Sequence, residues 1–321
     1  MVTRRAALLG AGLAVAGRRA WAAGYPARPV RIIVPFAPGG PTDIMARVVA
    51  GRLGERLGGS FIVENRPGAG SNIGTGVVAH AEPDGYTLLV TSSAFVVNPG
   101  LYKRVPYDPF KDFAPVAELG TSPNIFLADP KTGITGIAAL IAKAKADPAA
   151  LSYASAGIGT TPHLSGELLK ADAGISMTHV PYPGGSPAIQ AVLGSVTPIG
   201  CVSLPPTLQL VATGALTALA VTGVTRWPDL PAVPSMVELG FVGFPTDTFQ
   251  GFLAPAGTPA EITELLARTA LDILHDPATA AQLKANGFEV LANGPEGMRR
   301  RIADEVPKWR DLVAKAGITP V

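Results

Sequence analysis

Residues Val30 to Asp43 read Val-Arg-Ile-Ile-Val-Pro-Phe-Ala-Pro-Gly-Gly-Pro-Thr-Asp. The first five are mainly β-branched and apolar, which is typical of a strand covered on both faces. The glycine pair allows a turn and the close approach of a ligand, and the next proline suits a first helical turn, where Thr42 or Asp43 can cap it. We therefore predict a strand, a loop and a helix N-terminus that favours an anion. A plain strand-to-helix connection without a ligand fits these residues equally well.

Strands and helices alternate along the rest of the chain. Short apolar runs are separated by glycine-rich turns and amphipathic segments, a spacing that predicts βαβ units with parallel or mixed sheets, and thus an α/β fold. The chain has 321 residues, 47% of them hydrophobic, which is enough for two domains. We expect residues 23–123 plus 248–321 to form domain 1 and residues 124–247 to form domain 2. The apolar runs near 125–127 and 248–253 are predicted strands through which the chain leaves domain 1 and returns to it.

The first 22 residues are predicted to be an export signal. Arg4 and Arg5 precede an apolar run, and Ala20-Trp21-Ala22 offers a small-x-small cleavage site. The arginine pair also resembles a twin-arginine signal, and the export route is left open. A membrane anchor is the alternative, but the apolar run is shorter than the roughly 20 residues that a spanning helix needs. Removing this segment and its four arginines changes the net charge from +2 to −2.

Composition argues against several classes of function. Lys and Arg do not form a stripe interleaved with aromatic residues, so we expect no nucleic-acid partner. Gly68 to Gly74 does not match the G-x-G-x-x-G spacing of a dinucleotide site, and we expect no cofactor. No H-E-x-x-H motif or clustered acidic ligand set predicts a metal. Cys201 is the single cysteine, so no internal disulfide is expected.

Four loops at predicted strand ends are the candidate binding elements, because ligands of parallel α/β sheets bind at the carboxyl ends of the strands. They span residues 35–43, 68–74, 155–163 and 182–187. The third loop is the strongest of the later three, since it combines two glycines, two threonines and a helix start, and so provides several donors.

Nucleophilic catalysis is the alternative function for the third loop. Ser155 or Ser165 could act with His163 in an exported hydrolase. The chain has no Gly-x-Ser-x-Gly elbow, however, and a lone histidine at a helix start is more often a capping or packing residue. We therefore expect no enzyme activity.

Several motifs in a fixed order resemble one protein family over essentially the whole chain after the export signal. They are Tyr25-Pro26-Ala27-Arg28-Pro29-Val30, Val34 to Asp43 as quoted, Glu64-Asn65-Arg66-Pro67-Gly68-Ala69-Gly70, Pro83-Asp84-Gly85-Tyr86-Thr87-Leu88, Asp112-Phe113-Ala114-Pro115-Val116, His179-Val180-Pro181-Tyr182 and Ala254-Pro255-Ala256-Gly257-Thr258-Pro259. The chain is similar to the Bug family, the receptors of tripartite tricarboxylate (TctC-like) transporters.

This resemblance implies a periplasmic solute-binding protein with a two-domain Venus flytrap fold, in which each domain is a mixed or parallel sheet flanked by helices. It implies a non-catalytic monomer that binds a small carboxylate in the cleft and serves a membrane permease or a sensor. The ligand-binding positions that it implies, with the loops above, are Phe36, Ala37, Gly39, Gly40, Thr42, Asp43, Ser92, Ser93, Ser155, Ala156, Gly157, Gly159, Thr160, Thr161, His163, Tyr182, Gly184, Ser203 and Gln250.

The chain departs from the family pattern in the distal half of the pocket. Ala191 and Thr197 stand where members often have Asp, and Pro198 is also unusual there. Selectivity depends on the shape of the cleft. The sequence therefore predicts the class of ligand and leaves its identity open.

Overall fold

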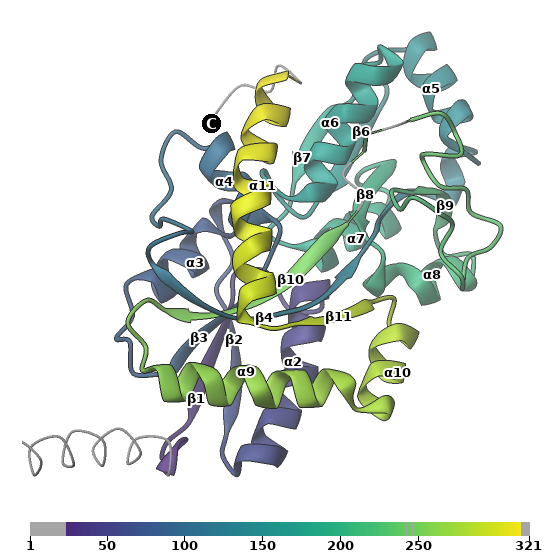
Figure 1. Cartoon of the computed structure of the whole chain (residues 1–321). Helices are drawn as coiled ribbons and strands as arrows, with labels where there is room; N and C mark the ends of the chain where they lie inside the picture. Colours follow the sequence, from purple (N-terminus) through teal and green to yellow (C-terminus); the bar gives the residue numbers. More distant parts are fainter. Residues whose placement is uncertain (1–23, 242, 245–246, 316–321) are drawn as a thin grey trace, which may run out of the picture.

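Two sheets, each flanked by helices, form two α/β lobes that lie side by side in the computed structural model (Figure 1). The structure describes residues 24–241, 243–244 and 247–315. The expected α/β class with mixed sheets is confirmed. The export signal predicted for residues 1–22 lies outside the described residues.

Lobe 1 is built on a six-stranded sheet of order β11-β4-β10-β3-β1-β2. Strand β1 pairs in parallel with β2 and β3, whereas β10 runs antiparallel to β3 and β4. Its elements are β1 (Val30–Val34), α2 (Pro41–Leu57), β2 (Phe61–Asn65), η2 (Ala69–Ser71), α3 (Asn72–Ala79), β3 (Thr87–Ser92), α4 (Ala94–Leu101), β4 (Phe113–Ser122), β10 (Thr248–Pro255), α9 (Ala260–His275), α10 (Pro277–Ala285), β11 (Glu289–Asn293) and α11 (Pro295–Lys315).

Lobe 2 is built on a five-stranded sheet of order β7-β6-β8-β5-β9. Strand β6 is parallel to β7 and β8, and β5 is antiparallel to β8 and β9. Its elements are β5 (Asn124–Ala128), η3 (Pro130–Thr132), α5 (Ile137–Ala146), β6 (Ser152–Ser155), α6 (Thr161–Ala173), β7 (Thr178–Pro181), α7 (Gly185–Leu193), β8 (Ile199–Ser203), η4 (Pro205–Thr207), α8 (Leu208–Ala212) and β9 (Thr217–Val221).

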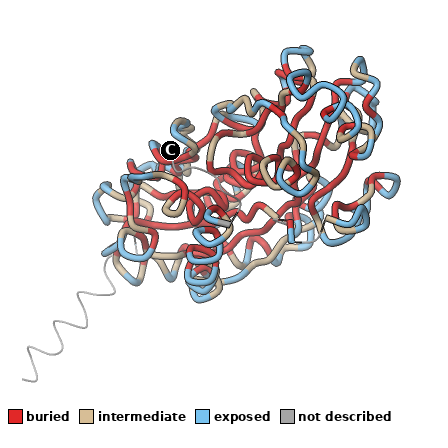
Figure 2. Tube along the Cα trace, turned by 90° about the horizontal axis from the view of Figure 1, so that it is seen from above, coloured by how far each residue is buried: buried red, intermediate tan, exposed pale blue. Residues whose placement is uncertain are grey.

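Each sheet carries an apolar core on both faces, and buried chain fills the interior of both lobes (Figure 2). Strand β1 illustrates the rule that successive side chains point to opposite faces. Val30, Ile32 and Val34 enter one cluster of lobe 1, whereas Ile33 enters the cluster on the other face. The continuous apolar run of β1 is therefore explained by burial on both sides.

The chain passes between the sheets twice. Strand β4 ends at Ser122 and β5 begins at Asn124, so a single residue, Pro123, connects the lobes there. The return runs from the end of β9 at Val221 to the start of β10 at Thr248. We propose that these crossings are the domain limits.

The structure contains two elements that the sequence pattern does not predict, helix α4 and strand β11. The sequence of α4, Ala94 to Leu101, holds β-branched residues and Asn-Pro-Gly, which favour strands and turns. Burial against α11 overrides this local preference.

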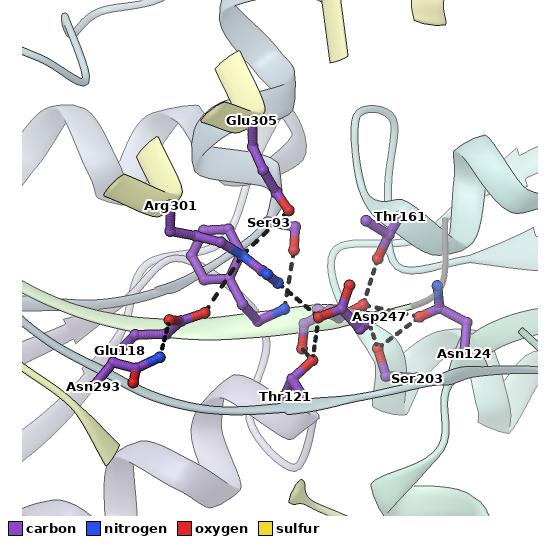
Figure 3. A network of polar contacts seen from close by, with 12 residues as sticks. Ser93, Glu118, Thr121, Asn124, Thr161, Ser203, Asp247, Asn293, Arg301 and Glu305 are labelled. Atoms are coloured by element: carbon purple, nitrogen blue, oxygen red, sulfur yellow. Dashed lines mark hydrogen bonds and ion pairs between the residues drawn. The ribbon is translucent and has the colours of Figure 1, made fainter. Parts of the chain in front are cut away.

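An ionic cluster joins the C-terminal helix to both crossing strands (Figure 3). Arg301 of α11 lies 2.6 Å from Asp247, which directly precedes β10 and accepts a hydrogen bond from Thr121 of β4 at 2.7 Å. The Arg301 Nε atom also lies 3.4 Å from Glu118 and 3.2 Å from Glu305. One guanidinium thus serves three carboxylates beside the second crossing.

We expect Arg301→Gln to lower the free energy of unfolding by about 3 kcal/mol, because it leaves the buried Glu118 without its cation. Arg299→Gln is the matched control on the same helix, since its ion pair with Glu296 is exposed and is worth less than about 0.5 kcal/mol. Urea unfolding followed by circular dichroism measures both. Equal losses in the two variants would contradict a structural role for the cluster.

Candidate functional site

Three helix N-termini meet at a cavity between the lobes. The N-cap residues are Gly40 for α2, Thr160 for α6 and Gly184 for α7. Residues from the start of each helix line the cavity, which we call the hydroxyl pocket. Its lining consists of Phe36, Gly40, Pro41, Thr42, Ser92, Ala156, Thr160, Pro162, Gly185, Ser203 and Thr248.

Glycine lets the loops of the two lobes touch through their backbones. A Cβ atom on Gly184 would lie 3.0 Å from the Ala37 nitrogen. The Ala37 N–H donates to the Pro183 carbonyl across the lobes at 3.0 Å. The same Pro-Gly-Gly triplet occurs at residues 38–40 and 183–185. The ends of α2 and α7 can therefore approach more closely than side chains would allow.

Hydroxyl groups and helix N-termini line the hydroxyl pocket. The five hydroxyls belong to Thr42, Ser92, Thr160, Ser203 and Thr248, and those of Thr160 and Thr248 donate within the protein, to the Gly157 carbonyl and to Asn124. None of its described lining residues is charged. Each helix N-terminus carries about half a positive charge and has unpaired N–H groups. The pocket therefore favours a small anion.

The hydroxyl pocket is small, with a cavity volume of about 20 Å³. That is room for about one water molecule. The lobes are thus closed around a space that matches a small polar head group.

Asp43 holds the first loop in shape. Its carboxylate accepts hydrogen bonds from Gly39 N, Arg47 Nε and Asn65 Nδ2, each at 2.9 Å. Burial raises the pKa of Asp43, but the hydrogen bonds from Arg47, Gly39 and Asn65 outweigh it and the net pKa is lowered. The Gly39 N–H is therefore occupied by Asp43 in this structure.

Two neutral histidines support the second loop from inside lobe 2. Ser155 Oγ lies 2.7 Å from His179 Nε2 and accepts a hydrogen bond from Gly157 N at 3.2 Å. The rings of His163 and His179 are 4.3 Å apart, and Tyr153 stacks on His179 at 4.8 Å. Burial lowers the pKa of His163 to about 4, and burial together with His163 lowers that of His179 to about 3. Neutral His179 can thus accept a hydrogen bond from the Ser155 hydroxyl at its Nε2 atom.

The Ser155 and Ser165 pairs considered for hydrolysis are not formed with His163. Ser155 contacts His179 instead, and the Nδ1 atom of His163 accepts from Gly159 N at 3.4 Å. Ser165 lies against the buried thiol of Cys201. The geometry assigns these groups to loop support and packing.

A second space adjoins the hydroxyl pocket. This aromatic hollow has a volume of about 270 Å³ and is lined by Phe36, Gly68, Ala69, Gly70, Ser71, Tyr102, Ala156, Gly157, Ile158, Pro181, Tyr182 and Pro183. Phe36 and Ala156 line both spaces, so the two are adjacent. Tyr102 of lobe 1 donates to the Ile158 carbonyl of lobe 2 at 3.2 Å, which closes the hollow on one side.

The predicted site residues fall into three groups. Those that line the hydroxyl pocket are Phe36, Gly40, Thr42, Ser92, Ala156, Thr160 and Ser203. Gly157 and Tyr182 line the aromatic hollow. The others do not line either space, and they are Ala37, Gly39, Asp43, Ser93, Ser155, Gly159, Thr161, His163, Gly184 and Gln250.

Several of these other residues hold the lining residues in place. Thr161 is hydrogen-bonded to Thr248, which also donates to Asn124 at 2.9 Å (Figure 3). Ser93 accepts from the Phe249 N–H at 3.0 Å. Gln250 is fully buried beside Ser92, its partner across strands β10 and β3.

Four lining residues were not among the individually predicted positions, namely Pro41, Pro162, Gly185 and Thr248. The first three lie within the predicted loops 35–43, 155–163 and 182–187, and only Thr248 lies outside them. Thr248 had no local signal, since its place depends on where β10 returns to lobe 1.

A larger groove lies beside the crossings, with a volume of about 640 Å³. Its lining mixes both signs of charge, including Arg226, Asp229, Lys284 and Glu289. It gathers no set of helix N-termini comparable to the hydroxyl pocket, which is therefore the better candidate for an anion.

The described residues contain no group of three or more His, Cys, Asp or Glu side chains that could hold a metal ion. Within the same residues, no helix combines the length and hydropathy needed to cross a membrane.

Comparisons with known proteins agree with the geometry. The model of the tripartite tricarboxylate transporter family receptor matches residues 45–318. Protein BugT of Bordetella pertussis is 37% identical over 320 residues, covering 98% of each chain. The structure of Rpa4515 from R. palustris with adipate has a TM-score of 0.89 at 34% identity, covering 92% of this chain and 100% of that one. MatC from Rhodopseudomonas palustris with bound malate has a TM-score of 0.85 at 31% identity, covering 90% and 100%.

The two buried histidines should make stability depend on pH. Between about pH 6.5 and 4 the unfolded chain binds protons that folded His163 and His179 do not, so the free energy of unfolding falls as the pH drops. At pH 5 the expected loss is up to about 2 kcal/mol for each histidine, relative to pH 7.

Urea unfolding of His163→Gln at pH 7 and pH 5 measures this contribution. The variant should lose less stability over that interval than the wild type. His275→Gln is the control, because His275 is exposed on α9. A pH dependence that His163→Gln leaves unchanged would refute the assignment.

Proposed function

The chain belongs to the tripartite tricarboxylate transporter receptor family, and from this premise we propose that it is an exported receptor that binds a small carboxylate between its lobes. The observation that carries the proposal is the meeting of three helix N-termini at a hydroxyl-lined pocket with no charged side chain among its described lining residues. Adipate and malate, bound by the two related proteins, are both carboxylates, which supports the proposed class of ligand.

Binding would rest on preorganised donors. A carboxylate oxygen in the pocket can accept from hydroxyls such as Thr42 and Ser92 and from free N–H groups of the helix starts. Closure of the lobes excludes water and strengthens these interactions, because the effective dielectric constant falls. Affinity then requires no lysine or arginine, since the helix ends supply the positive potential.

We further propose that the protein acts in the periplasm after removal of residues 1–22, as a monomer that delivers its ligand to a membrane permease or a sensor. Family membership supports the periplasmic location. A purely binding role is supported by the burial of Ser155, whose hydroxyl is hydrogen-bonded to His179 inside lobe 2 and is shielded from solvent.

A thermal-shift screen of small carboxylic acids tests the ligand class. A carboxylate that binds the folded chain at 100 times its Kd should stabilise it by about 2.7 kcal/mol and raise the Tm. The matched control for each hit is its primary amide, which has nearly the same shape without the charge. The amide should produce no shift, because the helix ends favour an anion. Equal shifts with acid and amide, or no shift with any acid, would overturn the proposal.

Gly40→Val tests the place of binding. The Gly40 φ angle is −80°, which valine adopts without strain, and its side chain would enter the hydroxyl pocket. We expect the ligand-induced Tm shift to disappear. Gly136→Val is the matched control, because Gly136 is the N-cap of α5 and a Cβ atom there meets nothing within 4 Å. If Gly40→Val kept the full shift, the pocket would be misassigned.

A further inference from the structure

We infer that the ligand is a monocarboxylate with an uncharged, apolar or aromatic tail, and that this tail lies in the aromatic hollow. The inference rests on the proposed function, in which the hydroxyl pocket holds the carboxylate. It adds the chemistry of the other end of the ligand. The sequence does not predict that end, because residues such as Ala191 and Thr197 depart from the family pattern in the distal half of the pocket.

The volumes of the two spaces indicate that the tail of the ligand lies in the hollow. The hydroxyl pocket offers about 20 Å³, room for one oxygen-sized group such as a single carboxylate oxygen. The adjoining hollow offers about 270 Å³. Because Phe36 and Ala156 line both spaces, a ligand whose head occupies the pocket can extend past these two residues into the hollow.

The lining of the hollow suits an uncharged tail. Tyr102, Tyr182 and Phe36 provide aromatic faces, and Ile158 with two prolines provides aliphatic surface. None of the described lining residues carries a charge. A second carboxylate placed there would meet apolar surface and no cation.

Two donors at the hollow are already engaged within the protein. The Tyr102 hydroxyl donates to the Ile158 carbonyl at 3.2 Å, and Ser71 N donates to the Gly68 carbonyl at 3.1 Å. Arg66, the basic residue nearest in sequence to Gly68, forms an ion pair with Glu64. The hollow thus offers a distal anion no free cation among its lining residues, whereas its aromatic rings can pack on apolar atoms.

The hydroxyl pocket and the hollow meet at Phe36, in the loop between β1 and α2, which we assign as a specificity-determining residue. Its side chain is 6% exposed and faces both the head and the tail spaces. Its ring is placed to contact the first atoms of the tail after the carboxylate.

Matched pairs of acids test the inference by isothermal titration calorimetry on the purified chain. Hexanoate and adipate have the same six carbons and differ in the second carboxylate, as do 4-methylbenzoate and terephthalate for an aromatic tail. We expect the monocarboxylate to bind at least tenfold more tightly than the dicarboxylate in any pair that binds, and at least one of the two monocarboxylates to bind.

The outcomes separate this inference from the proposed function. A dicarboxylate that binds as tightly as its partner, or failure of both monocarboxylates while another carboxylate raises the Tm, overturns the uncharged tail and leaves the carboxylate receptor standing. Failure of every carboxylate in the thermal-shift screen overturns the proposed function itself.

Ala69→Lys should change the preference. Ala69 is exposed and lines the hollow, and its backbone already accommodates a Cβ atom at its φ of 46°. An ammonium there would attract a distal carboxylate. We expect the ratio of hexanoate to adipate affinity to fall about tenfold. Ala278→Lys adds the same charge at an exposed position on α10 and should leave the ratio unchanged. Equal ratios in both variants and the wild type would place the tail elsewhere.

Discussion

The structure depends on holding three helix N-termini against one another across two lobes. Their partial positive charges repel, so the arrangement is costly without an anion and favourable with one. It is possible because Gly184 and its neighbours let backbones touch where side chains would clash. The three helix N-termini also explain why the pocket suits an anion although none of its described lining residues is charged.

Contacts outside the hydroxyl pocket fix the position of one lobe relative to the other. Leu164 of lobe 2 packs into a core cluster of lobe 1, and Tyr102 of lobe 1 binds the Ile158 carbonyl of lobe 2. At the second crossing, Arg301 ties the C-terminal helix to Asp247, the residue before the pocket-lining Thr248. The shape of the pocket therefore reflects packing over the whole chain.

Polar residues next to the pocket divide into those that face it and those that shape it. Asp43 engages Gly39 and Arg47, and Ser155 engages His179. Such bonds fix the loops before a ligand arrives, which lowers the entropic cost of binding. The buried neutral histidines that support these loops lower the free energy of unfolding at acidic pH, because the unfolded chain takes up protons that the folded chain excludes.

The sequence by itself determined the alternation of strands and helices, the loops at the strand ends and the start of α2, which favours an anion. These features follow from local periodicity and from the geometry of glycine and proline. Only the tertiary structure decided that α4 is a helix, that β11 joins the sheet, and that Thr248 lines the pocket. It also paired Ser155 with His179 instead of His163. The physical reason is that these features depend on which strands become neighbours and on burial between distant segments, and no short stretch of residues encodes either.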